Sequence, residues 1–133
     1  MSEYKEFESI VEAVENDLAF NDLNIMEKAI KMPAIKHYWV GKYIRAKIEL
    51  KKKEAERANL IKTLENSDKF TEVNLSKESL RRMWMSSPKM QEITERIEEL
   101  NFIVEYLNDA KYVLGRATDD IKNFIEIRKL ELM

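Results

Sequence analysis

Apolar residues near the start of the chain recur at the three- and four-residue spacing of a helix with one apolar side. These positions are Phe7, Ile10, Val11 and Val14. The pattern predicts an amphipathic helix over about residues 3–16. A connection at 17–23 and a short second helix follow, and that helix should end at Met32-Pro33, because the residue before a proline avoids helical backbone geometry. Together these elements form an acidic N-terminal part, residues 3–31.

The central part of the sequence has apolar residues on two sides of one long predicted helix, residues 34–65. One side consists of Ile35, Trp39, Tyr43, Ala46, Leu50, Leu60, Ile61 and Leu64. The other side consists of Val40, Ile44, Ile48, Ala55 and Ala58. Pro33 fits the first turn of this helix, where a missing N–H costs no intrahelical hydrogen bond. A helix with two apolar sides is expected to pack between neighbours.

The segment 66–87 has the least regular pattern, with a short helix expected to begin near Ser76. A stronger start signal closes this segment, because Ser87 can cap a helix whose first position is Pro88. A second long helix, residues 88–131, should follow and run antiparallel to the central one. The sequence therefore predicts an all-α fold of two long helices preceded by short N-terminal ones.

Apolar residues of the C-terminal helix form a heptad-like seam that is wider than one partner helix would cover. When the sequence is followed from residue 93 to residue 132 in alternating steps of four and three residues, nine of the twelve positions are apolar. Gly115 interrupts the seam and indicates a bend. We expect the seam to hold copies of the chain together, chiefly through Leu100, Val104, Leu107, Leu114, Ile121, Phe124 and Ile125.

The length of the C-terminal helix argues in the same direction. From Pro88 to Arg128, about 41 residues of helix span ~60 Å. A compact chain of this size has a diameter of only ~36 Å. A lone chain would then leave apolar surface uncovered, so we expect a homo-oligomer. The alternative is a long helical hairpin whose apolar faces cover each other.

The composition fits a single domain, residues 1–133. Two glycines, two prolines and no cysteine leave too few turn residues for an all-β fold and exclude disulfides and thiolate metal sites. The N-terminus lacks the basic and apolar stretches of a signal peptide, and no apolar run reaches the ~18 residues of a membrane span. We therefore expect a cytoplasmic protein that does not enter a membrane.

Charge is separated along the chain, although the net charge is only −2. Residues 1–30 hold eight acids and two lysines, for a net charge of −6. Residues 36–62 hold nine bases and three acids, for a net charge of +6. An anionic partner should be drawn to this central helix. The alternative is that the bases form an ordinary solvated helix face.

Four lysines of the central helix return to nearly the same side of it. Lys36 and Lys47 are eleven residues apart, as are Lys51 and Lys62. Eleven residues complete about three helical turns, so the four side chains form a stripe. Mobile point charges in a row suit sequence-independent contact with a phosphate backbone.

Aromatic residues near these lysines could stack on unpaired bases. Trp39 and Tyr43, however, lie on the apolar side of the helix, and we interpret them as core residues. The run 81–84, with the sequence RRMW, is the other basic and aromatic cluster. It is either a nucleic-acid contact or a packed turn.

Catalytic chemistry finds little support in the sequence. His37 is the only histidine, so histidine triads and multi-histidine metal sites are unavailable. Neither glycine belongs to a phosphate-binding loop. Adjacent acids such as Asp119 and Asp120 diverge by about 100° on a helix and do not converge on one atom. We expect a protein that is not an enzyme and that uses no cofactor or metal.

Two stretches of the chain resemble the UvsY recombination mediator family of T-even-like phages. The central stretch begins at Trp39-Val40-Gly41-Lys42 and continues through Glu54-Ala55 to Leu60-Ile61-Lys62. The C-terminal stretch runs from Ile121-Lys122-Asn123-Phe124 through Ile127-Arg128 to Glu131. With a similar length and order of helices, the resemblance covers most of residues 30–133.

The resemblance implies a ring-like homo-oligomer, of six or seven subunits, that binds single-stranded DNA and oligomerises through its C-terminal helix. It implies two protein partners, a RecA-like recombinase and the single-strand-binding protein that the recombinase displaces with the mediator's help. The setting is phage recombination, repair and recombination-dependent replication, in the cytoplasm of the host cell. A helical adaptor that recognises partner helices without DNA is the alternative.

The resemblance also bears on single residues. Lys62 matches a lysine with which the family contacts DNA, whereas Leu64 stands where the family has an arginine. That contact is either lost or moved to Arg57 or to the run 51–53. The expected nucleic-acid contacts are therefore Lys36, Lys47, Lys51, Arg57 and Lys62.

Overall fold

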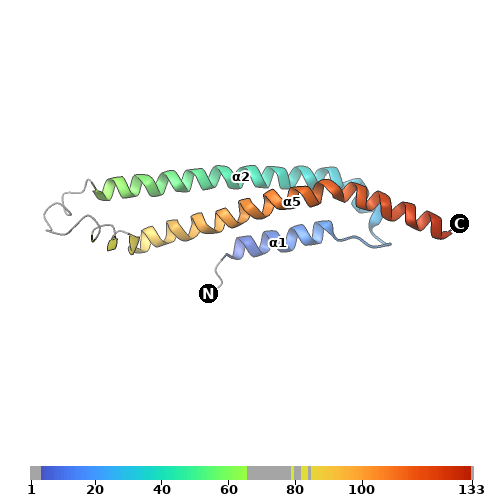
Figure 1. Cartoon of the computed structure of the whole chain (residues 1–133), viewed down its shortest axis with the longest axis horizontal. Helices are drawn as coiled ribbons and strands as arrows, with labels where there is room; N and C mark the ends of the chain where they lie inside the picture. The colour runs from blue at the N-terminus through green and yellow to red at the C-terminus, as the bar shows by residue number, and fades with distance from the viewer. Residues whose placement is uncertain (1–3, 66–78, 80–81, 84, 133) are drawn as a thin grey trace. The chain divides into compact units, whose positions relative to one another are not determined.

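Three α-helices account for nearly all of the chain that the computed structural model describes, residues 4–65, 79, 82–83 and 85–132 (Figure 1). Helix α1 spans Lys5–Leu18, α2 spans Ile25–Glu65 and α5 spans Pro88–Leu132. No described residue lies in a strand. The predicted all-α class is confirmed. The short helix expected near Ser76 falls outside the described residues.

Two compact units divide the chain. The first comprises Met1–Ala46 and Phe102–Met133, and the second comprises Lys47–Asn101. Each long helix therefore contributes one part to each unit. In the first unit the parts of α2 and α5 run antiparallel, because Lys36 bonds to Thr118 while Tyr43, further along α2, bonds to Asn108, earlier on α5.

Helix α1 covers the pair of long helices in the first unit. Its apolar stripe buries Ile10 and Val14, which are 5% and 1% exposed. These side chains share one cluster with Trp39 of α2 and Leu107 of α5. The amphipathic pattern predicted for the N-terminal helix is confirmed, with bounds shifted by two residues. Each large side chain buried in this way contributes about 1.5–3 kcal/mol.

Helix α2 passes through Pro33, which corrects the predicted break between a short helix and a separate helix from residue 34. A proline inside a helix costs about 3 kcal/mol. Ile25 and Met32 are buried in a second cluster with Ala117 and Ile121 of α5. Burial of those two large side chains contributes about 3–6 kcal/mol, which offsets the cost of the proline. Pro33 itself is exposed.

Side-chain hydrogen bonds fix the corner between α1 and α2. The Asn21 Oδ1 atom accepts from the backbone N–H groups of Leu23, at 2.9 Å, and Asn24, at 3.0 Å. Asn24 Oδ1 accepts in return from the backbone N–H of Asn21, at 2.7 Å. Lys28 Nζ donates to the carbonyl of Asn16, at 2.9 Å, close to the end of α1. The Asn21 and Asn24 bonds hold the connection in one conformation, and the Lys28 bond satisfies a carbonyl in the last turn of α1 that has no intrahelical partner.

Helix α5 begins where the sequence predicts. The Ser87 Oγ atom accepts from the backbone N–H of Met90 at 3.3 Å, which is the geometry of a serine cap, and Pro88 occupies the first helical position. Met90 is fully buried. The other buried α5 side chains of the second unit are Ile93, Ile97 and Leu100.

The described residues leave the second apolar side of α2 largely exposed. Val40 is 50% exposed, and Ile44 and Ile48 are each 49% exposed. The expectation that α2 packs between neighbours on both sides therefore stays a prediction for the second side. Ala55 and Ala58, on the same side, are also exposed. Only the side that contains Trp39 and Ala46 is buried.

Truncating Leu107 should destabilise the protein strongly. Leu107 is 2% exposed at the centre of the first cluster, so Leu107→Ala should lower the free energy of unfolding by about 2–5 kcal/mol. Tyr112→Ala is the control, because Tyr112 on the same helix is 67% exposed; the change should cost less than about 1 kcal/mol. Urea unfolding at one fixed protein concentration measures both. Equal losses would contradict the described core.

Candidate nucleic-acid interface

A row of basic side chains lies on α2 in the second unit. We call Lys47, Lys51, Arg57 and Lys62 the basic surface. The three lysines are exposed, whereas Arg57 is half-buried and leaves α2 on another side, because it comes eleven residues after buried Ala46. Lys51 and Lys62 are eleven residues apart on one unbroken helix, so their side chains leave it within about 20° of each other. The basic surface can therefore present several positive charges to one extended anion.

Ion pairs neutralise part of the acidic charge next to the basic surface. The Glu49 carboxylate lies 2.7 Å from the Arg96 guanidinium of α5. Arg96 also pairs with Glu99, at 3.0 Å, and its side chain is only 25% exposed. On α2 itself, Lys53 pairs with Glu56 at 3.3 Å. The Arg96 pairing joins α2 to α5 and leaves less repulsion toward an anionic ligand.

Lys36, the remaining lysine of the predicted stripe, belongs to the first unit. Its Nζ atom donates to Thr118 Oγ1 of α5 at 2.6 Å. It also lines a cavity between α2 and α5. The structure thus gives Lys36 a local partner and a place at a pocket, which spacing along the sequence does not reveal.

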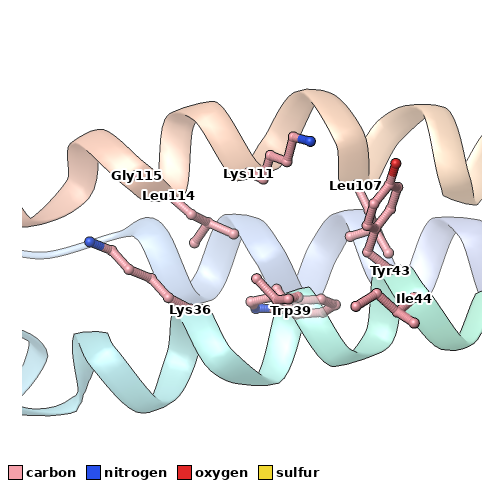
Figure 2. Close-up of a pocket in the computed structure, with 9 residues that line it drawn as sticks. Lys36, Trp39, Tyr43, Ile44, Leu107, Lys111, Leu114 and Gly115 are labelled. Carbon is pink, nitrogen blue, oxygen red and sulfur yellow. The ribbon is translucent and has the colours of Figure 1, made fainter.

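The cavity, which we call the Gly115 pocket, has a volume of about 380 Å³ (Figure 2). Its two lysines come from different helices, Lys36 from α2 and Lys111 from α5. The Lys111 Nζ atom lies 5.5 Å from the ring centroids of both Tyr43 and Tyr112. The lining residues are Lys36, Trp39, Val40, Tyr43, Ile44, Leu107, Lys111, Leu114 and Gly115.

Trp39 and Tyr43 are core residues, as predicted. Trp39 is 4% exposed, and its Nε1–H donates to Asp17 Oδ2 at 2.8 Å. The Tyr43 hydroxyl donates to Asn108 Oδ1 at 3.3 Å. Trp39 is therefore too buried to stack on a base, and Tyr43 is partly buried against the first cluster. Of the run 81–84, the structure describes only Arg82 and Met83, both exposed.

The predicted oligomerisation seam lies within the chain's own packing. Leu100, Leu107, Leu114 and Ile121 are between 1% and 3% exposed. The other three members, which are partly buried and pack beside the two clusters, are Val104, Phe124 and Ile125. Six of the seven therefore pack in or beside clusters that include residues of α2 in the same chain, and their part in contacts between copies stays a prediction. The large apolar α5 residues that stay more than half exposed are Tyr112, Val113, Ile127, Leu130 and Leu132.

Solved structures resemble this chain over nearly its whole length. Two crystal forms of the bacteriophage T4 recombination mediator protein UvsY superpose with a TM-score of 0.71. One is 13% identical and covers 95% of this chain and 97% of its own, and the other is 14% identical and covers 93% and 97%. In fold, the chain is similar to UvsY. No protein-family model and no curated protein sequence matches it.

The likeness to UvsY confirms the predicted resemblance at the level of the fold. Side-chain features such as the Gly115 pocket and the Arg96 pairs are described from this chain alone. Sequence reasoning missed both. The available signals were Lys111, a charge at a seam position, and Arg96, a charge beside that seam. The sequence does not indicate which α2 residue either of them contacts, because the contact depends on the register between the two helices.

Among the described residues, three ionisable groups have shifted pKa values, each with a local cause. A hydrogen bond and the charge of Lys31 lower the pKa of Glu27. Burial raises the pKa of the Tyr106 hydroxyl. Hydrogen bonds to Asp22 and Glu131 raise the pKa of Arg128. The shifts of Glu27 and Arg128 come from ion pairs at the protein surface, and the shift of Tyr106 comes from burial beside the core. None of the three therefore indicates a catalytic acid or base.

The described residues contain neither a cluster of metal ligands nor a helix that could span a membrane. In residues 4–65, 79, 82–83 and 85–132, no three side chains of His, Asp or Glu are grouped as metal ligands would be. Over the same part of the chain, no helix combines the length and the apolar character needed to cross a membrane.

Removing the Arg96 charge should weaken the second unit modestly. Arg96→Gln leaves Glu49 and Glu99 without their shared partner, so the free energy of unfolding should fall by about 1–2 kcal/mol at low salt and by less at high salt. Lys53→Gln is the control, because it removes an i,i+3 pair at 3.3 Å on α2 that is worth less than about 1 kcal/mol. Urea unfolding at two salt concentrations measures both. A salt-independent loss for Arg96→Gln would refute the electrostatic explanation.

Proposed function

We propose that the protein is a non-enzymatic recombination mediator that binds single-stranded DNA without sequence preference. In this role it promotes loading of a RecA-like recombinase in place of single-strand-binding protein. The observation that carries the proposal is the similarity in fold to the mediator UvsY, over 95% of the chain. The predicted resemblance in the central and C-terminal helices, found independently of the fold, supports the same role.

The basic surface is the proposed contact with the phosphate backbone. Lysine ammonium groups neutralise phosphates without reading bases, so the affinity should not depend on sequence. Lys51 and Lys62 are exposed on one side of α2, and Arg57 is the proposed substitute for the arginine that Leu64 replaces. We assign Lys36 a smaller part, because its amine already bonds to Thr118.

Repetition of the basic surface in a homo-oligomer would strengthen an individually weak contact. A few lysines bind a strand feebly, but linked copies bind with an affinity well above that of one site. We propose that the copies meet through apolar side chains left exposed on α5, such as Val113, Ile127 and Leu130. A ring of six or seven subunits is the arrangement that the predicted family resemblance implies.

An adaptor that binds partner helices without DNA is the second candidate function. One observation favours it: Val40, Ile44 and Ile48 form an exposed apolar row on α2. Such a row could receive an amphipathic helix. Sedimentation with and without oligo-dT separates the two candidates, since the mediator should move with DNA and the adaptor should not.

Binding of single-stranded DNA should weaken steeply with salt. Each neutralised phosphate should contribute about −0.7 to the slope of log affinity against log salt. Lys51→Ala with Lys62→Ala should make that slope shallower by about 1.4 and weaken oligo-dT and mixed-sequence strands equally. Fluorescence anisotropy titrations at several salt concentrations measure both effects.

The matched control removes two exposed lysines outside α2. Lys5→Ala with Lys89→Ala changes the net charge by the same amount, and both residues are exposed. That double variant should keep most of the affinity and slope. Equal weakening by the two double variants would show a general charge effect and contradict the assigned surface. Undetectable DNA binding by the unmodified protein would sink the proposal.

A charge on the exposed side of α5 should reduce the mass of the oligomer. Ile127 is 56% exposed and Leu130 is 70% exposed. Ile127→Glu with Leu130→Glu should shift light-scattering mass toward the monomer, because burying a charge in an apolar contact is costly. Asn123→Glu, at an exposed polar position of α5, is the control and should leave the mass unchanged. A stable monomer before any substitution would overturn the assembly.

A further inference from the structure

The Gly115 pocket combines an apolar interior with positive charge and no negative charge. Seven of its nine lining residues are apolar, aromatic or glycine, and the other two are Lys36 and Lys111. None of the lining residues that the structure describes is a carboxylate. All nine residues belong to the first unit. A pocket of this chemistry favours an apolar group that carries negative charge beside it.

Gly115 is the one lining residue whose identity neither the backbone nor the packing explains. A glycine in the middle of a helix costs about 1 kcal/mol relative to alanine. Gly115 does not have a positive φ, so the backbone conformation does not require it. A Cβ atom built there would meet no atom within 4 Å, so no neighbour requires it either. The position that a side chain of residue 115 would occupy is therefore open space at the pocket.

The two lysines can receive carboxylates from opposite edges of the pocket. Lys36 Nζ uses one of its three N–H donors on Thr118 Oγ1. The Lys111 ammonium rests against the rings of Tyr43 and Tyr112, both 5.5 Å away, and no described carboxylate pairs with it. Both amines therefore retain donors for an incoming anion.

The interior suits an aliphatic or aromatic side chain better than a nucleobase. A base is held by stacking on an open ring face or by hydrogen bonds to its edge. Trp39 is 4% exposed with its N–H bonded to Asp17, and Lys111 occupies one face of Tyr43. The remaining apolar surface comes from Val40, Ile44, Leu107 and Leu114, which offer no polar side-chain atom.

We propose that the Gly115 pocket binds an acidic peptide segment of a partner protein. One or two large apolar side chains of the peptide enter the pocket, and flanking carboxylates pair with Lys36 and Lys111. The volume of about 380 Å³ accommodates such an anchor. The inference rests on the pocket itself and holds whether or not the basic surface binds DNA.

Filling the pocket tests the proposal without removing any charge. Gly115→Met extends a side chain into the open space, whereas Gly115→Ala removes the glycine but leaves most of the space free. Both variants should fold, since each residue favours a helix more than glycine does. Anisotropy of a fluorescein-labelled peptide that alternates Asp with Leu and Phe should show binding to the unmodified protein and to Gly115→Ala. Gly115→Met should bind it about tenfold more weakly or worse.

Charge reversal at the rim tests the electrostatic part. Lys111→Glu and Lys36→Glu should each weaken binding of the same peptide about tenfold, because each places like charges together. Lys89→Glu makes the same change on an exposed lysine of α5 outside the pocket and should have little effect. A second peptide with Ser in place of Leu and Phe should not bind measurably. A third peptide, with Lys in place of Asp, should also show no measurable binding.

Three results would overturn the proposal. Equal affinity of Gly115→Met and Gly115→Ala for the acidic peptide would place its binding outside the pocket. Loss of oligo-dT binding by Gly115→Met, with peptide binding unchanged, would assign the pocket to nucleic acid. A fall in light-scattering mass of Gly115→Met would assign it to a second copy of the chain. The first result leaves the DNA-binding proposal intact, so the two proposals fail separately.

Discussion

Two antiparallel helices cover only the side chains that face each other, so the interior of such a pair is one residue deep. The first unit gains a deeper core because α1 closes over the groove between α2 and α5 with Ile10 and Val14. Trp39 is buried at that three-helix contact, and Asp17 near the end of α1 accepts its indole N–H. Without α1, the large rings of the cluster would have no cover, and burial of each such side chain is worth about 1.5–3 kcal/mol.

The same geometry leaves much apolar surface outside the core. One side of α2 and one side of α5 have no helix to cover them, which is why Val40, Ile44, Val113 and Ile127 are about half exposed. Exposed apolar rows of this length are a feature of proteins that associate. The covered faces thus stabilise the fold, and the uncovered faces remain exposed to other molecules.

Charged groups follow the same division. Arg96 pairs with Glu49 and Glu99 and helps to join α5 to α2 in the second unit, so its charge is used for folding. Lys51 and Lys62 remain exposed on α2, where an anionic strand can reach them. Lys36 and Lys111 lie at the edges of the Gly115 pocket, where charge is combined with apolar surface. The surroundings of each ammonium group therefore decide which kind of ligand that lysine can contact.

Local periodicity determined the elements of this protein. The helix class, the serine cap before Pro88, the amphipathic α1 and the core position of Trp39 all follow from spacing along one helix, and the structure agrees. The basic stripe on α2 was likewise visible in the spacing of its lysines.

Tertiary structure alone decided which partner covers each face. Pro33 was expected to end a helix, yet burial of Met32 against α5 keeps α2 continuous. Leu107 and Ile121 pack in clusters with residues of α2 in the same chain, a neighbour that their spacing along α5 does not name. Gly115 lines a pocket between α2 and α5, which no pattern along a single helix indicates. The physical reason is that periodicity records which side of a helix is apolar, whereas the neighbour on that side depends on contacts between residues far apart in the chain.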